Sequence, residues 1–158
     1  MTGLAGHVEL REPVDSDLDI IFPMTQDPVA NQMSMVYPRS REAFEEQWNS
    51  RSGDPASVLR IILLDGEIVG RINSFTKEGE THVGYLIAQE HWGKGVMTAA
   101  LTQFVGLVER RPLEARAAKS NLGSCRVLEK CGFEKIGEWD SPETERYIAC
   151  VECVYRLD

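Results

Sequence analysis

Residues Gly84 to Ala100 carry the clearest chemical signal in the sequence. They follow the pattern of a strand, a glycine turn and a helix, because apolar residues recur every three to four positions after Gly95. Gly93 and Gly95 let the backbone come close to a ligand, and the unpaired N–H groups and dipole of the helix start favour an anion. We therefore expect a phosphorylated ligand here. The expected donors are the N–H groups of Gly95, Val96 and Met97 and the side chains of Lys94 and Thr98.

Two common nucleotide-binding patterns do not fit this turn. The G-x-G-x-x-G fingerprint needs glycine at the position of Thr98, and the Walker pattern needs Ser or Thr after Lys94, where Gly95 stands. A bare G-x-G is also compatible with a tight strand-to-helix turn that binds nothing. The turn therefore needs a second motif before it can be interpreted.

That second motif extends from Asn121 to Phe133. With it, the sequence resembles the GNAT (Gcn5-related) N-acetyltransferase superfamily, and most of all the ribosomal-protein N-terminal acetyltransferases of the RimJ/RimL type. The resemblance spans the whole chain, but it departs from the wider family pattern at Glu90, where Gln or Arg often stands. The matching residues are Gly84-Tyr85, Trp92-Gly-Lys-Gly95, Asn121, Ser124 and Gly132-Phe133.

The resemblance implies acetyl-CoA as the cosubstrate. Its pyrophosphate would lie on the amides from Gly93 to Thr98, and its pantetheine arm would pair with a strand as an additional strand does. Asn121 would reach the pantetheine, and Ser124 would lie near the sulfur as general acid for the CoA thiolate. Without the glycine motif, we would interpret Asn121 as a helix N-cap and Ser124 as a solvated helix residue. The strand residues expected to pair with pantetheine are Leu86, Ile87 and Ala88.

The resemblance also implies direct attack of an amine on the thioester in a ternary complex. No acyl-enzyme is required, so we interpret Cys125 as a core residue and not as a nucleophile. A strand amide near Leu86 would stabilise the oxyanion. His82 is a candidate general base, at a position where relatives often carry Glu, and it is equally compatible with a structural role. Glu138 and Glu152 in the last strands are competing candidates.

The pKa of the acceptor amine ranks the substrates. Deprotonating a lysine amine of pKa about 10.4 at pH 7 costs about 4.6 kcal/mol, whereas an α-amine of pKa about 7.7–8.0 costs only about 1–1.4 kcal/mol. Since no strong base is evident, we expect acetylation of a protein or peptide N-terminal α-amine. The alternatives are an acetyltransferase for a small-molecule amine, such as an antibiotic or a polyamine, and a catalytically decayed CoA-binding sensor.

The elements that must position these residues follow from periodicity and from turn residues. Asp65-Gly66 predicts a hairpin turn, Ser40 a helix N-cap, and Gly132-Phe133 a left-handed helix stop followed by an apolar residue. Together they predict one α/β domain over residues 1–158, with a central mixed, mostly antiparallel β-sheet flanked by about four helices. The expected strands are Val8–Arg11, Ser57–Leu64, Ile68–Thr76, Glu80–Ala88, Leu113–Ala117, Glu134–Trp139 and Arg146–Arg156. The expected helices are Asp15–Phe22, Arg41–Trp48, one after Gly95 with Val96, Ala100, Phe104, Leu107 and Val108 on its apolar face, and one capped by Asn121 that carries Cys125, Leu128 and Cys131 inward.

Composition excludes several function classes. The chain has 158 residues, 42% of them hydrophobic, and a formal net charge of −8, which speaks against nucleic acid or an anionic membrane as a partner. Met1 to Leu10 contains no signal-peptide pattern, and the longest apolar run, Val58–Leu64, is too short to span a membrane, so we expect a cytoplasmic protein.

The four cysteines are expected to be reduced thiols. Cys150 and Cys153 have the C-x-x-C spacing, but residues three apart in a strand face opposite sides, which speaks against a shared redox or metal role. No second such pair exists for zinc, and we expect no metal.

The net charge is unevenly distributed along the chain. Residues 1–80 contain 7 basic and 14 acidic side chains, whereas residues 91–135 contain 8 basic and 4 acidic ones. The basic segment includes both CoA motifs and suits a polyanionic cofactor, and the acidic half would attract a cationic amine acceptor, unless it is an ordinary solvated surface. The paired final strands also make a homodimer edge conceivable.

Overall fold

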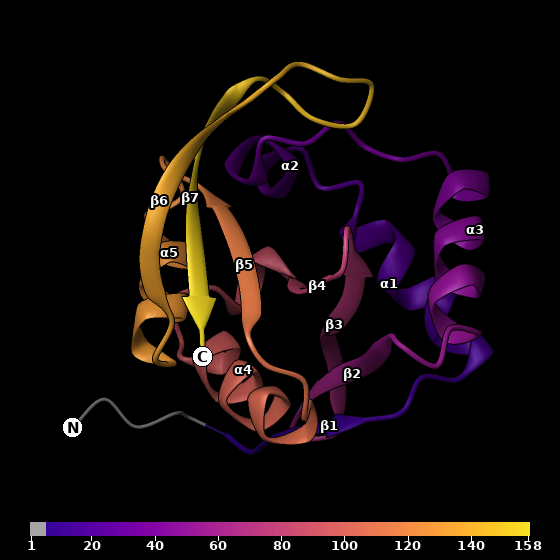
Figure 1. Ribbon diagram of the computed structural model, residues 1–158. Helices are drawn as coiled ribbons and strands as arrows, with labels where there is room; N and C mark the ends of the chain where they lie inside the picture. Colours follow the sequence, from indigo (N-terminus) through magenta and orange to yellow (C-terminus); the bar gives the residue numbers. More distant parts are fainter. Residues whose placement is uncertain (1–5) are drawn as a thin grey trace.

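The computed structural model describes residues 6–158, which form a single α/β domain around one seven-stranded sheet (Figure 1). The order of the strands is β1-β2-β3-β4-β5-β7-β6, and all neighbours are antiparallel except β4 and β5, which are parallel. This confirms the predicted α/β fold class with a mixed, mostly antiparallel sheet. The strands are β1 (Val8–Arg11), β2 (Val58–Leu64), β3 (Glu67–Lys77), β4 (Glu80–Ile87), β5 (Leu113–Ala118), β6 (Glu134–Ser141) and β7 (Cys150–Leu157).

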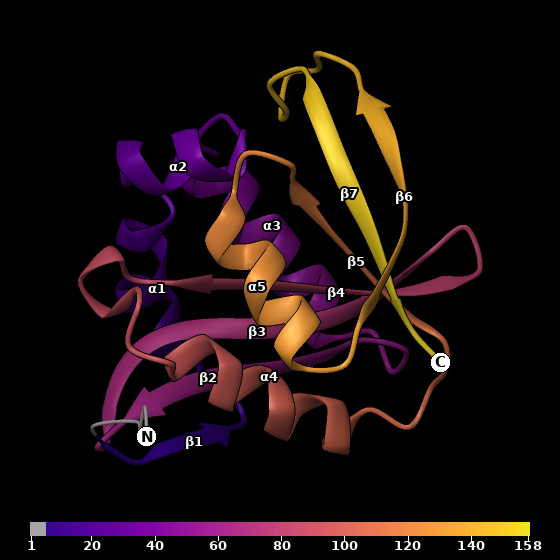
Figure 2. The ribbon, with the colours of Figure 1, turned by 90° about the vertical axis from the view of Figure 1, so that its left-hand side faces the viewer.

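Helices cover both faces of the sheet. Two of them, α4 (Val96–Leu107) and α5 (Leu122–Lys130), pack on one face, and α1 (Leu18–Met24) and α3 (Arg41–Ser52) pack on the other (Figure 2). The α4/α5 face contains the larger core, with Phe104, Leu128 and Tyr155 almost fully buried. The α1/α3 face has a smaller core around Phe44 and Trp48. A further helix, α2 (Pro28–Ser34), and the short 3-10 turns η1 (Asp15–Asp17) and η2 (Gln89–His91) complete the elements.

The sheet opens between β4 and β5. These two strands pair only at Thr81 with Leu113 and at His82 with Glu114. Beyond these positions β4 stays paired with β3 up to Ile87, while β5 follows β7, so the two strands diverge. The backbone edge of β4 that faces the opening is therefore left without a neighbouring strand.

Several local predictions are confirmed by the structure. Asp65-Gly66 forms the hairpin turn between β2 and β3, with φ values of 51° and 84° that suit a two-residue turn of the type I′ kind. Ser40 caps α3 by accepting a hydrogen bond from the Ala43 N–H at 3.1 Å. Gly132, with φ 91°, follows the end of α5 in a left-handed conformation that terminates the helix, and Phe133 is buried.

Other details differ from the sequence-based expectations. Helix α2 was not predicted, although Asp27 accepts a hydrogen bond from the Val29 N–H and Pro28 occupies the first helical position. Leu107 was expected on the buried face of α4 but is 49% exposed, because it lies at the last residue of the helix. The last strand begins at Cys150 and not at Arg146, because residues 142–149 form a connection that reaches over to the end of α2.

The cytoplasmic location stays a prediction. The absence of a signal-peptide pattern was inferred partly from Met1–Ala5, which lie outside the described residues. No helix within residues 6–158 has the length and apolar character needed to cross a bilayer. The homodimer stays a prediction.

Gly70 allows β3 to approach the end of β4, and its replacement should destabilise the protein. A Cβ at Gly70 would lie 2.1 Å from the carbonyl oxygen of Leu86 and 3.0 Å from the Cα of Ile87, so the β4 backbone would have to move. We expect Gly70→Ala to lower the free energy of unfolding by about 1–3 kcal/mol, measured by urea denaturation.

Gly106→Ala in α4 is the matched control, since no atom lies within 4 Å of the added methyl group. Alanine should leave the stability unchanged or raise it by about 0.5–1 kcal/mol, because glycine is unfavourable inside a helix. Equal stability of the Gly70→Ala variant and the native protein would show that the strand can shift without a penalty.

Candidate active site

The glycine turn before α4 leaves a set of backbone N–H groups unpaired. Gly93 and Gly95 have positive φ values of 73° and 79°, and no atom lies within 4 Å of a Cβ placed on Gly93. Gly95 is the N-cap of α4 but has no side chain to accept a bond, and the Ala99 N–H makes the first bond within the helix, to the Gly95 carbonyl. The N–H groups of Val96 to Thr98 are therefore without partners in the helix. Lys94 is exposed beside them.

The side chains around this turn hold it against the sheet. Val96 and Met97 are buried in the larger core and fix the first turn of α4. Trp92 donates a hydrogen bond from its indole N–H to the Ile87 carbonyl at 3.0 Å, which ties the turn to the end of β4. Thr98 is partly exposed, and its carbonyl accepts from the Thr102 hydroxyl.

The backbone at the end of β4 is only partly free. Ala88 donates its N–H to the Val69 carbonyl and accepts from the His91 N–H, so both of its backbone groups are engaged. Leu86 lies opposite Arg71 of β3, and its carbonyl points at Gly70. Since backbone groups alternate along a strand, the N–H of Ile87 faces the opening. Of the three backbone positions expected to pair with pantetheine, Ile87 is thus the one whose N–H is best placed.

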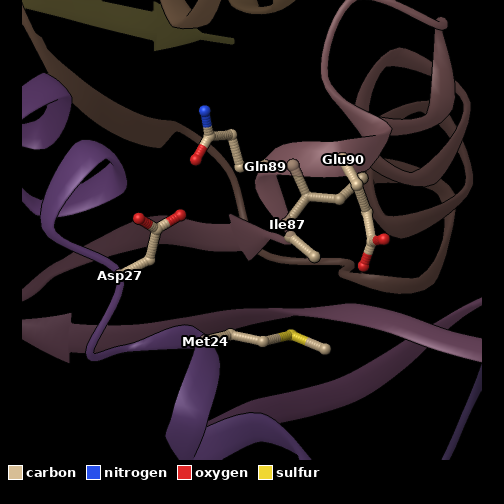
Figure 3. A pocket seen from close by; sticks show the side chains of 6 residues that line it. Met24, Asp27, Ile87, Gln89 and Glu90 are labelled. Carbon is tan, nitrogen blue, oxygen red and sulfur yellow. The ribbon is translucent and has the colours of Figure 1, made fainter.

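A hollow of about 500 Å³ lies at this end of β4. Figure 3 shows Met24, Asp27 and Gln89 arranged around Ile87. The hollow therefore joins the end of α1, the segment before α2 and the η2 turn to the opening in the sheet.

Ser124 and Tyr85 meet on the α5 side of the opening. The Tyr85 hydroxyl lies 2.6 Å from Ser124 Oγ, a hydrogen bond in which either group can be the donor. Burial raises the pKa of Tyr85 to about 12, so its hydroxyl stays protonated near neutral pH. Asn121 accepts from the Ser124 N–H at 3.2 Å and so caps α5, as its spacing predicted. Sequence reasoning used Tyr85 only as a motif residue and missed its contact with Ser124.

His82 lies on the opposite face, where β4 and β5 are still paired. The residue is 9% exposed, its ring stacks on Phe75 with 5.4 Å between ring centroids, and its Nδ1 is 3.1 Å from a carboxylate oxygen of Glu114. Burial is the main cause that lowers the pKa of His82, so the imidazole is neutral at pH 7. A neutral ring that donates from Nδ1 to Glu114 keeps Nε2 as a proton acceptor.

Two carboxylates, of Glu80 and Glu114, lie close to the His82 ring. The ligand-type atoms of Glu80, His82 and Glu114 lie within 4.8 Å of one another. Such a set of one nitrogen and two carboxylates has the composition of a metal site, although acidic groups often gather without one. The expected absence of a metal stays a prediction.

The competing bases occupy different surroundings. Glu138 lies on the edge strand β6 between Lys119 and Lys135, whose hydrogen bonds lower the pKa of its carboxyl group and weaken it as a base. Glu152 on β7 is partly exposed, and burial raises the pKa of its carboxyl group.

The cysteines are free thiols in the described residues. Cys125 is buried, and burial raises the pKa of its thiol, which opposes formation of a nucleophilic thiolate. Cys153 is buried whereas Cys150 is partly exposed, and no disulfide joins them.

Comparison with known proteins decides the family. Residues 7–134 match the family model described as the acetyltransferase (GNAT) domain. The chain belongs to the GNAT acetyltransferase family. This membership confirms the family that the glycine turn and the Asn121 motif indicated, and it identifies the chain as an acetyltransferase domain. The match ends at the first residue of β6, so the final hairpin lies outside it.

Individual GNAT relatives agree with this assignment. The probable N-acetyltransferase YjcK of Bacillus subtilis (strain 168) is 42% identical over 59 residues, which cover 35% of this chain and 33% of that protein. The match thus spans about a third of the length of that relative.

Solved structures share the fold over nearly the whole chain. Spermidine N-acetyltransferase from Vibrio cholerae, in complex with CoA and spermine, has a TM-score of 0.78 at 18% identity and covers 94% of both chains. RimJ from Mycobacterium smegmatis, in complex with CoA-disulfide, has a TM-score of 0.78 at 21% identity and covers 98% of this chain and 83% of that one. At these identities the likeness establishes the fold.

The pKa of His82 generates a pH prediction. If His82 accepts the amine proton, kcat at saturating substrates should fall as the pH drops below 6.5, because the protonated ring cannot accept a proton and burial places its pKa below that value. His82→Gln should lower kcat at pH 7.5 by about 10²-fold and remove this acidic limb. The measurement is CoA release against pH.

His7→Gln, at an exposed histidine, is the control and should keep the native profile. An unchanged acidic limb in the His82→Gln variant would assign the titration to another group.

Proposed function

We propose that the chain transfers the acetyl group of acetyl-CoA directly to a primary amine, preferentially the α-amine of a protein or peptide N-terminus. The observation that carries this proposal is the opening between β4 and β5, which has the Tyr85–Ser124 hydroxyl pair on one face and His82 on the other. A thioester in the opening would present its sulfur to Ser124, and an amine entering from the α3 side would approach its carbonyl carbon beside His82.

The residues at the opening fit acetyl-CoA. The unpaired N–H groups of Val96 to Thr98 suit a pyrophosphate, and the free edge of β4 suits an arm that contains amides. Asn121 uses Oδ1 to cap α5 and keeps its Nδ2 amide as a donor to that arm. The Vibrio cholerae and Mycobacterium smegmatis structures contain CoA or CoA-disulfide, which supports the same cosubstrate for this chain.

Ser124 would act on the leaving sulfur. When Tyr85 donates its hydroxyl hydrogen to Ser124 Oγ, the Ser124 hydroxyl is free to donate to the sulfur as negative charge develops there. The N–H of Ile87, which faces the opening, would stabilise the oxygen of the reacting carbonyl. The protein thus supplies one donor for each atom that gains charge.

His82 would receive the proton that the amine loses. Its lowered pKa makes it a weak base, and this favours acceptors that are themselves easily deprotonated. At pH 7 an α-amine needs only about 1–1.4 kcal/mol for deprotonation, against about 4.6 kcal/mol for a lysine side chain. We therefore place N-terminal α-amines ahead of lysine side chains.

A small-molecule amine is the second candidate acceptor. It is favoured by the fold likeness to a spermidine N-acetyltransferase that was solved with spermine. A CoA-binding sensor without turnover is the non-enzymatic alternative, and it would need neither Ser124 nor a base.

An acceptor panel tests the proposed function. Purified protein and acetyl-CoA are incubated with a peptide that has a free α-amine and no lysine, with its Nα-acetylated counterpart that carries one lysine, and with spermidine. We expect the α-amine peptide to be acetylated faster than the lysine peptide by at least 10-fold, as measured by mass spectrometry. Lysine modification with untouched α-amines would overturn the ranking, and tight CoA binding without any product would support the sensor.

Variants at the hydroxyl pair test the role of Ser124. Ser124→Ala should lower kcat by about 10²-fold with little change in the KM for acetyl-CoA, because the donor acts on charge that develops in the transition state. Tyr85→Phe should lower kcat less. Ser120→Ala, at an exposed serine just before α5, should behave as the native protein. A native kcat for Ser124→Ala would remove Ser124 from the mechanism.

A further inference from the structure

Four arginines converge on the α3 side of the sheet. Arg71, on β3, donates a hydrogen bond to Asn73 Oδ1 at 2.8 Å, and the guanidinium of Arg51, on α3, lies 4.4 Å from the centroid of the Phe75 ring. Arg51, Arg71 and Asn73 line one small cavity together with Gln47. The other two arginines join this group through hydrogen bonds. Arg39 donates to Gln47 Oε1, and Arg146 donates to the carbonyl of Tyr37, two residues from Arg39.

We call Arg39, Arg51, Arg71 and Arg146 the arginine cluster. Within residues 6–158 no carboxylate lies within 4.0 Å of any of the four, although Arg11, Arg41 and Arg116 all have such partners. All four are partly buried. Burial and repulsion from the other members lower the pKa of Arg71 to about 9 and that of Arg146 to about 10. Four partly buried positive charges are thus held together without a negative group of the protein between them.

Two polar groups in this region also lack a partner among residues 6–158. Asn73 is only 1% exposed, and its Nδ2 amide has no acceptor. The Nε of Arg146 is buried and likewise has no acceptor. Both unpaired groups are donors, as are the guanidinium groups around them, so the missing partner is an acceptor of hydrogen bonds.

The arginine cluster lies next to the proposed base. Phe75, under the Arg51 guanidinium, also stacks on His82, and Arg71 lies opposite Leu86 at the end of β4. The cluster lies beside α3, where Arg51 and Arg71 share a cavity with Gln47 and Trp48. The anion site is at the start of α4, and this helix covers the other face of the sheet (Figure 2). The two sets of donors are therefore separate, and the phosphates of CoA would occupy only the second.

We propose that the amine acceptor carries an anionic group, a carboxylate or a phosphate, that binds the arginine cluster while its amine faces His82. This inference rests on the proposed acetyl transfer. Guanidinium groups suit both anions because their paired N–H groups match the oxygens of either one. A polyamine lacks such a group and is repelled by the same four charges.

The arginine cluster implies a negative group on the acceptor, whereas the distribution of charge along the sequence suggested only a cationic acceptor. Residues 1–80 are acidic in total, but Arg39, Arg51 and Arg71 belong to that segment and turn toward the acceptor side. Several carboxylates of the segment are held elsewhere, as Asp17 is by Arg11. The acceptor would therefore combine a cationic amine with a negative group, as an acidic N-terminal peptide or an amino acid does.

Paired acceptors test the inference on the intact protein. Ser-Asp-Glu-Gly amide is compared with Ser-Asn-Gln-Gly amide to test a peptide side-chain carboxylate. Serine is compared with serine amide to test an α-carboxylate, and phosphoethanolamine with ethanolamine to test a phosphate. Spermidine is measured as a polyamine without an anionic group. We expect at least one anionic member to exceed its neutral partner by 10-fold or more in kcat/KM, and the pair that does so identifies the source of the anion. Equal rates within all pairs, or faster acetylation of spermidine, would overturn the inference.

Variants connect the preference to the cluster. Arg51→Ala and Arg146→Ala should each reduce the preference for the anionic acceptor by about 10-fold, whereas Arg156→Ala, at an exposed arginine paired with Asp158, should retain it. Affinity for CoA, measured by calorimetry, should be native in all three and reports correct folding. Retention of the preference in both cluster variants would contradict the assignment.

A binding measurement separates this inference from the proposed function. Protein saturated with CoA is titrated with N-acetyl-Asp-Glu, which carries carboxylates but no amine. Binding that is lost in Arg51→Ala and Arg146→Ala supports the arginine cluster even if no amine is acetylated. Acetylation of amines without any binding or preference for anions would leave the proposed function standing and remove the inference.

Discussion

The short parallel contact between β4 and β5 is the constraint on which the rest of the site depends. It consists of two register positions, Thr81 with Leu113 and His82 with Glu114. A longer ladder would close the edge of β4 from which the Ile87 amide projects. Without any ladder, the β1–β4 and β5–β7 parts of the sheet would lose their fixed orientation. The contact thus holds the two parts together at one end and lets them separate at the other.

Because side chains alternate along β4, the proposed catalytic residues lie on two different faces of the sheet. His82, Gly84 and Leu86 share the α3 face, whereas Tyr85 and Ile87 point to the α4/α5 face. His82, the proposed base, and Tyr85, which contacts Ser124, are therefore carried by one strand only three residues apart but lie on opposite faces of the sheet. Gly84, between His82 and Leu86 on the α3 face, has no side chain and so leaves space on that face. The nearest atoms to a Cβ added at Gly84 would belong to Asn73 and Phe75.

Local signals in the sequence were sufficient for most of the elements and for the glycine turn that precedes α4. The caps at Ser40 and Asn121 depend on neighbouring residues, and both were predicted correctly. The signal for α2, Asp27 followed by proline, was also present and was overlooked. The Tyr85–Ser124 contact joins residues 39 apart in the chain, so no local pattern could reveal it. The arginine cluster was hidden for a further reason. Its members are dispersed from Arg39 to Arg146 among many acidic residues, and a charge sum over a segment contains no directions.

The hydrogen bond from the Trp92 indole to the Ile87 carbonyl joins the two parts of the proposed CoA site. The glycine turn that precedes α4 and the free edge of β4 are thereby fixed relative to each other, at the distance set by one side chain. The protein therefore loses the entropy of positioning its phosphate-binding turn and its strand edge when it folds. Little of this cost remains to be met when a long flexible molecule binds. A cofactor with a different length between its phosphates and its reactive end could not place both at their binding groups at the same time. Trp92 therefore sets the cofactor length that the site accepts.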